Sequence, residues 1–299
     1  MIEPAREAPG ISRPIALGHG LQAPRVRGLH GLLDLKAEVV AGRTRLTAIR
    51  QRPPLQVLRA LHLDTAVPDL ASITIASPSG GVLQGDHLET RIEIASGARL
   101  HVGTQSATRI YRCPEAPAQI RTELIVHSAG YLEYIPDAYL PFAASRLEAT
   151  MICRVASDAT ALLAEVVTGG RLARGEAFDL DKFESIIEVR RLDDELLARD
   201  VLRLGASEPA ARLGRLGRNL AVGTLFVIHA GFGADILRDR LDVAGAVVVA
   251  GASDLPNGAG AWLRVLAPDG RAASAVVAAG WTAARLAILG SAPALDRRL

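Results

Sequence analysis

The chain has 299 residues, of which 49% are hydrophobic and 22% charged, and its formal net charge is +2. This composition excludes an intrinsically disordered chain, and so small a net charge gives no electrostatic basis for binding nucleic acid. Two cysteines, Cys113 and Cys153, are too few to make a disulfide framework or a tetrahedral zinc site on their own.

The N-terminal segment is rich in Pro and Gly and contains no apolar core, so we expect no signal peptide. We predict that residues 1–25 form a flexible extension and that residues 26–299 form a single β-rich domain. The most apolar late segment, residues 243–252, is too short to span a bilayer. A cytoplasmic protein without membrane contact is therefore expected.

Apolar and polar residues alternate in three early segments, at residues 33–39, 88–94 and 120–126. A period of two residues is typical of a strand with one face toward a core and the other toward water. We therefore predict half-buried strands over the first two thirds of the chain.

These strands belong to an internal repeat, in which an alternating strand, a small polar turn and a more apolar strand follow one another. The unit occurs at residues 88–104, 120–136 and 147–166, and Leu100, Leu132 and Leu162 are its equivalent leucines. Repeats of roughly 30 residues can stack and bury a continuous core between neighbours. The sequence predicts a layered, β-helix-like stack or a sandwich.

The pattern of apolar and polar residues changes after residue 171. Residues 183–192 read as a strand, residues 195–204 as either strand or helix, and residues 206–219 as a loop. Helical spacing is present only late, at residues 235–241 and 271–289, and the second of these predicts a mostly buried helix.

Catalytic and metal-binding motifs are weak. The glycine-rich segment 78–86 lacks the Lys-Ser/Thr of a phosphate loop and precedes a strand, so it predicts turns instead. No G-x-S-x-G motif is present, and the seven histidines show no metal-binding spacing. We expect no permanently bound metal, although carboxylates could hold Ni²⁺ weakly enough to release it.

Several carboxylates lie in otherwise apolar strands. Glu133 and Glu165 are the clearest examples, and Glu188 and Asp200 lie in comparable strands further on. If both faces of such a strand are covered, an unpaired carboxylate would be costly to bury. Each could instead face solvent or pair with an arginine, and the sequence leaves both interpretations open.

Seven short motifs, in the same order along the chain, resemble those of the UreD/UreH family of urease accessory proteins. The resemblance covers most of the chain, roughly residues 32–228, although Ser79 and Gln84 depart from the usual pattern. The motifs are G-R-T-R-L at 42–46, P-L-Q-V-L-R at 54–59, P-S-G-G-V-L-Q-G-D at 78–86, T-Q-S-A-T-R-I-Y-R at 104–112, L-E-Y-I-P at 132–136, G-R-L-A-R-G-E-A-F at 170–178 and V-G-T-L at 222–225.

The resemblance implies a mainly β fold of two layers, with a β-helix-like stack of strands and a few late helices. It implies a maturation factor that is not an enzyme, which binds a UreF-type partner, recruits a UreG-type GTPase and docks on the urease apoprotein, with room for a homodimer within the complex. It also implies no permanent cofactor but transient Ni²⁺. The matching positions give Asp86, Glu165, Glu176 and Asp200 as candidates for a nickel path.

Two rival functions remain open. One is a hydrolase or isomerase that uses Asp86 with Glu133 or Glu165 as an acid/base pair. The other is a β-solenoid module that binds carbohydrate, against which the aromatic content of only 4% argues.

Overall fold

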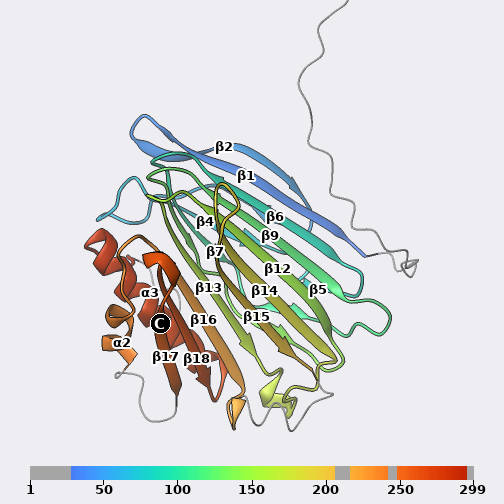
Figure 1. Ribbon diagram of the computed structural model, residues 1–299. Helices are drawn as coiled ribbons and strands as arrows, with labels where there is room; N and C mark the ends of the chain where they lie inside the picture. Colours follow the sequence, from blue (N-terminus) through green and yellow to red (C-terminus); the bar gives the residue numbers. More distant parts are fainter. Residues whose placement is uncertain (1–27, 206–215, 242–247, 295–299) are drawn as a thin grey trace, which may run out of the picture.

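The structure is a computed structural model that describes residues 28–205, 216–241 and 248–294 (Figure 1). The predicted extension at residues 1–25 and most of the loop predicted at 206–219 lie outside the described residues. The division into an extension and one domain at residues 26–299 stays a prediction.

The first layer is a seven-stranded sheet, called sheet A here, with the order β15-β14-β12-β9-β6-β1-β2. Neighbours from β1 to β14 are parallel, while β2 and β15 pair antiparallel at the two edges. Its strands are β1 (His30–Val40), β2 (Arg43–Arg52), β6 (His87–Ile94), β9 (Ala118–Val126), β12 (Arg146–Val155), β14 (Lys182–Arg191) and β15 (Leu196–Leu204).

The second layer is sheet B, whose main path has the order β17-β18-β16-β13-β10-β7-β4-β3. Strands β4, β7, β10 and β13 are parallel, and antiparallel strands continue the sheet on both sides. Its strands are β3 (Gln56–Val57), β4 (Ala71–Ala76), β7 (Arg99–Thr104), β10 (Tyr131–Tyr134), β13 (Thr160–Thr168), β16 (Ala221–Ile228), β17 (Val249–Asp254) and β18 (Gly260–Ala267).

Short elements complete the described fold. Three brief strands branch from sheet B, since β11 pairs with β13, β8 with β11, and β5 with β8; two 3₁₀ helices and two α-helices are described later in the chain. They are β5 (Gly81–Val82), β8 (Thr108–Ile110), β11 (Tyr139–Pro141), η1 (Leu172–Arg174), η3 (Pro256–Gly258), α2 (Asp235–Leu241) and α3 (Gly270–Leu289).

The internal repeat is the structural unit of the stack. In each unit the first strand joins sheet A and the second joins sheet B, as in β6–β7, β9–β10 and β12–β13. Successive units pair in parallel, so Leu100 lies beside Leu132. The predicted β-helix-like stack of two layers is therefore confirmed.

One register prediction is wrong. Leu132 pairs with Ala161, whereas Leu162 pairs with Glu133. Strand β13 is buried on both faces, so its sequence shows no alternation that could fix the register. Only the stacking of the units decides which residue of β13 faces which layer.

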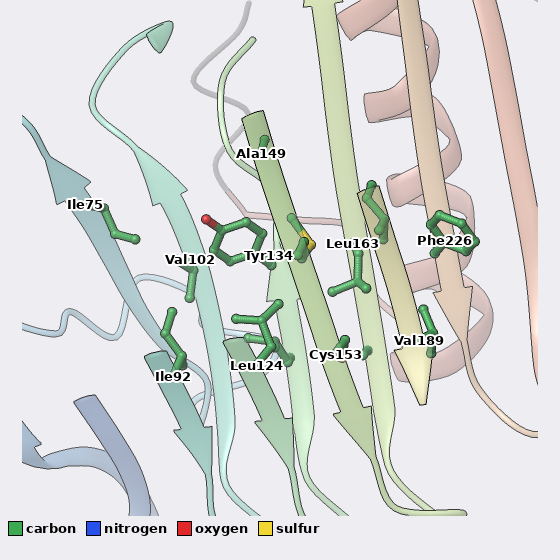
Figure 2. Packing of buried hydrophobic residues seen from close by; sticks show 14 of the residues in the cluster. Ile75, Ile92, Val102, Leu124, Tyr134, Ala149, Cys153, Leu163, Val189 and Phe226 are labelled. Carbon is green, nitrogen blue, oxygen red and sulfur yellow. The ribbon is translucent and has the colours of Figure 1, made fainter. Parts of the chain in front are cut away.

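The main core lies between the two sheets. The alternating residues of the three predicted strands point into it, among them Leu35, Ile92 and Leu124, and only Val39 of the predicted set is exposed. Figure 2 shows side chains from both sheets meeting there, such as Ile92 and Cys153 from sheet A and Val102 and Phe226 from sheet B.

A second core lies on the other face of sheet B, where α2 and α3 cover the strands around β16 (Figure 1). Because this face is covered as well, β10, β13 and β16 are buried on both sides. Helix α3 is long and apolar enough to cross a membrane by length and composition, but half of its apolar window is buried, as expected for a core helix. Helices α2 and α3 confirm the two helices that were predicted from the helical spacing at residues 235–241 and 271–289.

Candidate functional site

Glu165 lies on β13 and points between the two sheets. Its side chain is buried, and Ser185 Oγ of β14 in sheet A donates a hydrogen bond of 2.6 Å to its Oε2. An ionised carboxylate in this position needs partners, because transfer from water into an apolar core is costly. The single hydroxyl from the facing sheet meets only part of that need.

The protonation of Glu165 reflects this environment. Burial, together with the weaker effect of the negative charge of Asp200, raises the pKa of the Glu165 carboxyl to about 7. The hydrogen bond from Ser185 and the positive charge of Arg264 act in the opposite direction. Glu165 can therefore exchange a proton near neutral pH, which few carboxyl groups do.

Asp200 and Arg264 join the two sheets next to Glu165. Arg264 Nη2 on β18 donates to both carboxylate oxygens of Asp200 on β15, at 2.5 and 2.6 Å. Within sheet B, Glu165 pairs with Thr224 and Thr224 pairs with Arg264, so the three residues form one row across β13, β16 and β18. Asp200 and Arg264 retain some exposure, so this end of the row reaches the surface.

The opposite end of the row approaches a small cavity of about 80 Å³ between the sheets, called the inner cavity here. Thr90, Thr122, Tyr134 and Tyr139 are among its lining residues. Tyr134 pairs with Leu163 and Tyr139 with Val167, on either side of Glu165 along β13. Burial raises the pKa of both tyrosines and the charge of Glu165 raises it further, as expected for near neighbours.

Together these groups form a polar row through an apolar core. The row is defined here as Thr90, Thr122, Tyr134, Tyr139, Glu165, Ser185, Thr224, Asp200 and Arg264. It offers hydroxyl and carboxylate oxygens, which hold a divalent cation without the strong binding of thiolate or multiple imidazoles.

Glu133 belongs to a different cluster, on the face of sheet B that is turned toward α3. Its carboxylate is buried and accepts hydrogen bonds from Tyr131 Oη (2.6 Å) and His101 Nδ1 (2.8 Å). Arg285 of α3 lies 3.5 Å from it and also binds Asp64. Burial raises the pKa of Glu133, but the hydrogen bond and charge of His101 and the charge of Arg285 outweigh burial and hold that pKa below its usual value.

Asp86 and Glu176 lie in turns and loops. The two carboxylate oxygens of Asp86 accept hydrogen bonds from the backbone N–H groups of Leu29 and Leu83, at 2.8 Å each. Glu176 binds Arg171, whose hydrogen bond holds its pKa low. Among the four predicted site residues, Glu165 and Asp200 lie close enough for the charge of Asp200 to affect the pKa of Glu165. The contacts of Asp86 and Glu176 instead stabilise the conformation of loops.

Glu188, the other carboxylate noted in the sequence, is paired with Arg190 and Arg199 on the outer face of sheet A. The hydrolase hypothesis pairs Asp86 with Glu133 or Glu165, and within the described ranges Asp86 makes no hydrogen bond with either glutamate. Glu133 and Glu165 occupy opposite faces of sheet B, and the oxygens of Asp86 are engaged by backbone groups.

The residues around Glu165 that could contact a metal ion are oxygen donors and are not gathered into a cluster of His, Cys, Asp or Glu side chains in the described ranges. No group of three or more His, Cys, Asp or Glu side chains that could hold a metal ion occurs within residues 28–205, 216–241 and 248–294. Burial raises the pKa of the Cys153 thiol to about 12, so this sulfur is protonated at neutral pH and is a poor ligand.

Sequence reasoning missed Ser185, Arg264, Arg285 and Asp64, the partners of the buried carboxylates. Arg285 carried the strongest signal, because it is a charged residue within the apolar helix α3. The others are ordinary polar residues in strands and loops, and their distance in sequence from their partners leaves no local pattern.

Comparison with known proteins bears on the family of this chain. The family model described as "UreD urease accessory protein" matches residues 29–298. The chain is similar to urease accessory protein UreD 2 of Streptomyces griseus (35% identity, covering 79% of this chain and 82% of the relative). It is also similar to urease accessory protein UreD of Haloarcula marismortui (34% identity, 91% of each chain) and of Mycolicibacterium gilvum (34%, 78% and 86%).

A match over nearly the whole chain, with relatives above 30% identity, shows the family. The chain belongs to the UreD family of urease accessory proteins.

Proposed function

We propose that this protein is a maturation factor for urease that passes Ni²⁺ between its two sheets toward the urease apoprotein. The membership in the UreD family supports the role in urease maturation. The observation that carries the nickel path is the polar row, in which Glu165 is buried between the sheets and Asp200 marks the row's exposed end. We propose no catalytic role for these residues.

The chemistry of the row suits an ion in transit. Ni²⁺ would exchange part of its water shell for hydroxyl oxygens in the inner cavity and then for the carboxylate of Glu165. Binding there displaces a proton from a group with a pKa of about 7, so the free-energy change of the exchange is small at neutral pH. Asp200 would then take the ion in competition with Arg264, which keeps its binding weak.

The partners follow from the same proposal. A UreF-type protein and a UreG-type GTPase would supply the ion, and the apoprotein would receive it. The GTPase releases Ni²⁺ on hydrolysis, and this chain provides the protected route from there. Asp86 and Glu176 remain predicted members of the path, and their contacts support a role in shaping the loops around it.

The test is co-expression of urease and its other accessory proteins with this chain, without it, or with the variants Glu165→Ala and Asp200→Asn. We expect both variants to assemble with the partners while the nickel content of purified urease falls roughly tenfold, the scale on which loss of a metal-handling group acts. Glu188→Gln is the matched control, because it removes a carboxylate on the outer face of sheet A, outside the polar row. Full nickel loading with both variants would overturn the path.

A further inference from the structure

A cluster of buried polar groups lies where helix α3 covers sheet B (Figure 1), apart from the polar row. Its members are His101 of β7, Tyr131 and Glu133 of β10, Arg285 of α3, and Asp64. His101 also lines a pocket of about 1010 Å³, called the outer pocket here, and its side chain is 23% exposed. Protons from solvent can therefore reach its ring.

We infer that His101 is a pH-sensitive contact between sheet B and α3, which holds the helix more strongly when its imidazole is protonated and less strongly when it is neutral. His101 pairs with Glu133 on the neighbouring parallel strand, so the two side chains lie on the same face of the sheet. That face is the one covered by α3, since His101 contacts Trp281 and Glu133 contacts Arg285. This role is independent of the proposed nickel path.

The charges of the cluster balance when His101 is protonated. Arg285 donates a hydrogen bond to Asp64, and its Nη1 lies 3.5 Å from the carboxylate of Glu133, so two buried carboxylates share one guanidinium. Nδ1 of His101 lies 2.8 Å from the other oxygen of Glu133. A protonated ring therefore supplies the second cation to Glu133. Its loss leaves a buried carboxylate partly uncompensated, which is costly.

Trp281 is the residue through which His101 contacts α3. The two rings stack, with their centroids 5.3 Å apart and their planes inclined by 20°. A cation over the face of an indole is attracted by the π electrons, so protonation strengthens this contact as well as the one to Glu133. Burial holds the pKa of Tyr131 well above its usual value, so its hydroxyl remains a hydrogen-bond donor to Glu133 and does not take over the titration.

The remaining described groups around His101 are uncharged or balanced in sign. Its neighbour in register on β4 is Ser72, which carries no charge. The charged groups are Arg59 and Asp137 on the lining of the outer pocket, and Arg99, which pairs with Asp69 at 3.2 Å. Histidine changes charge between about pH 5 and 8. The stabilisation from the protonated ring is therefore present in acid and is lost as the pH rises through this range.

Tryptophan emission tests the inference, because the chain contains only Trp262 and Trp281. The variant Trp262→Phe leaves Trp281 as the sole indole of the full-length protein. We expect its emission to change in one step between pH 5 and 8 and to be weaker in acid, because a protonated imidazole in contact with an indole quenches it. Adding His101→Gln, which keeps a hydrogen-bond donor but no titrating charge, should remove the step.

Two further variants locate the effect. His127→Gln is the matched control, because His127 also pairs with a carboxylate, that of Glu93 at 3.4 Å, but lies at the end of β9 in sheet A. It should leave the step unchanged. Glu133→Gln should move the midpoint of the step to lower pH by about one unit, because a neighbouring carboxylate favours the charged form of the ring. A step that persists in His101→Gln, or no step at all, would overturn the inference.

Urea unfolding shows whether the proton at His101 also stabilises the fold. At pH 5 the unmodified protein should unfold at a higher urea concentration than His101→Gln, and the gap should narrow by pH 8. Glu165 titrates in the same range but is present in both proteins, so its contribution cancels. A gap that stays constant with pH would refute the inference, because it would make His101 an ordinary structural hydrogen-bond partner of Glu133.

Discussion

Ser185 of sheet A donates a hydrogen bond of 2.6 Å to Glu165 of sheet B, across the core that joins the two sheets. Like the ion pair between Asp200 and Arg264, this contact is a polar link between layers whose shared core is mainly aliphatic and aromatic. Because its carboxylate member has a pKa of about 7, the core carries a group whose charge changes near neutral pH. Stability and function should both respond to that change.

The first prediction concerns stability against pH. The pKa of Glu165 is raised from 4.5 to about 7 on folding, so the folded state binds a proton more tightly than the unfolded chain. The stabilisation from this proton is complete below pH 4.5 and is lost as the pH rises through 7, and it amounts to about 3 kcal/mol.

The Glu165→Gln variant isolates this effect, because glutamine stays neutral at every pH. Urea unfolding of the two proteins should give similar free energies at pH 4.5 and a more stable variant at pH 8. A difference between them that does not change with pH would contradict the raised pKa.

The second prediction concerns nickel transfer against pH. In the proposed path Ni²⁺ displaces the proton of Glu165, so loading of urease should decline as the pH falls through about 7. The ratio of loading by the unmodified protein to loading by Glu165→Gln removes the pH effects of the other components. This ratio should fall toward one in acid. A constant ratio would show that protonation of Glu165 does not limit transfer.

The third prediction concerns Arg285, the cation that holds Glu133 and Asp64 beneath α3. Arg285→Met leaves two buried carboxylates without a guanidinium, which should lower the free energy of unfolding by about 3–5 kcal/mol. Arg271→Met, at the exposed start of the same helix, is the control and should have little effect. Adding Glu133→Gln to Arg285→Met should recover part of the loss, and no recovery would contradict the charge argument.

The fourth prediction concerns the contact between α3 and sheet B. A Cβ atom added at Gly223 of β16 would lie 2.8 Å from Val277 Cγ2 and 3.3 Å from Val265 Cβ. Gly223→Ala should therefore destabilise the protein by about 1–3 kcal/mol, as overpacking of a core does. At Gly251 of β17 no atom lies within 4 Å of the added Cβ, so Gly251→Ala should be tolerated. Chemical unfolding of both variants makes the comparison.

The sequence by itself determined the strands, their repeat and the family. Alternation in segments such as residues 88–94 is a local signal, because one face of each strand contacts solvent and the other contacts the core. The late helices were equally clear from their spacing, and α2 and α3 lie where that spacing predicted them. The seven motifs indicate the family by their residues and order alone, because they require no information about the fold.

Only the tertiary structure decided what the carboxylates do. Glu133 and Glu165 look alike in sequence, yet they lie on opposite faces of sheet B, and Glu188 is paired at the outer surface. Their partners, such as Arg264 for Asp200, are distant in the chain and meet only because parallel units stack in register. In strands buried on both sides, one residue of register decides which face a side chain joins, and local sequence carries no signal for that choice.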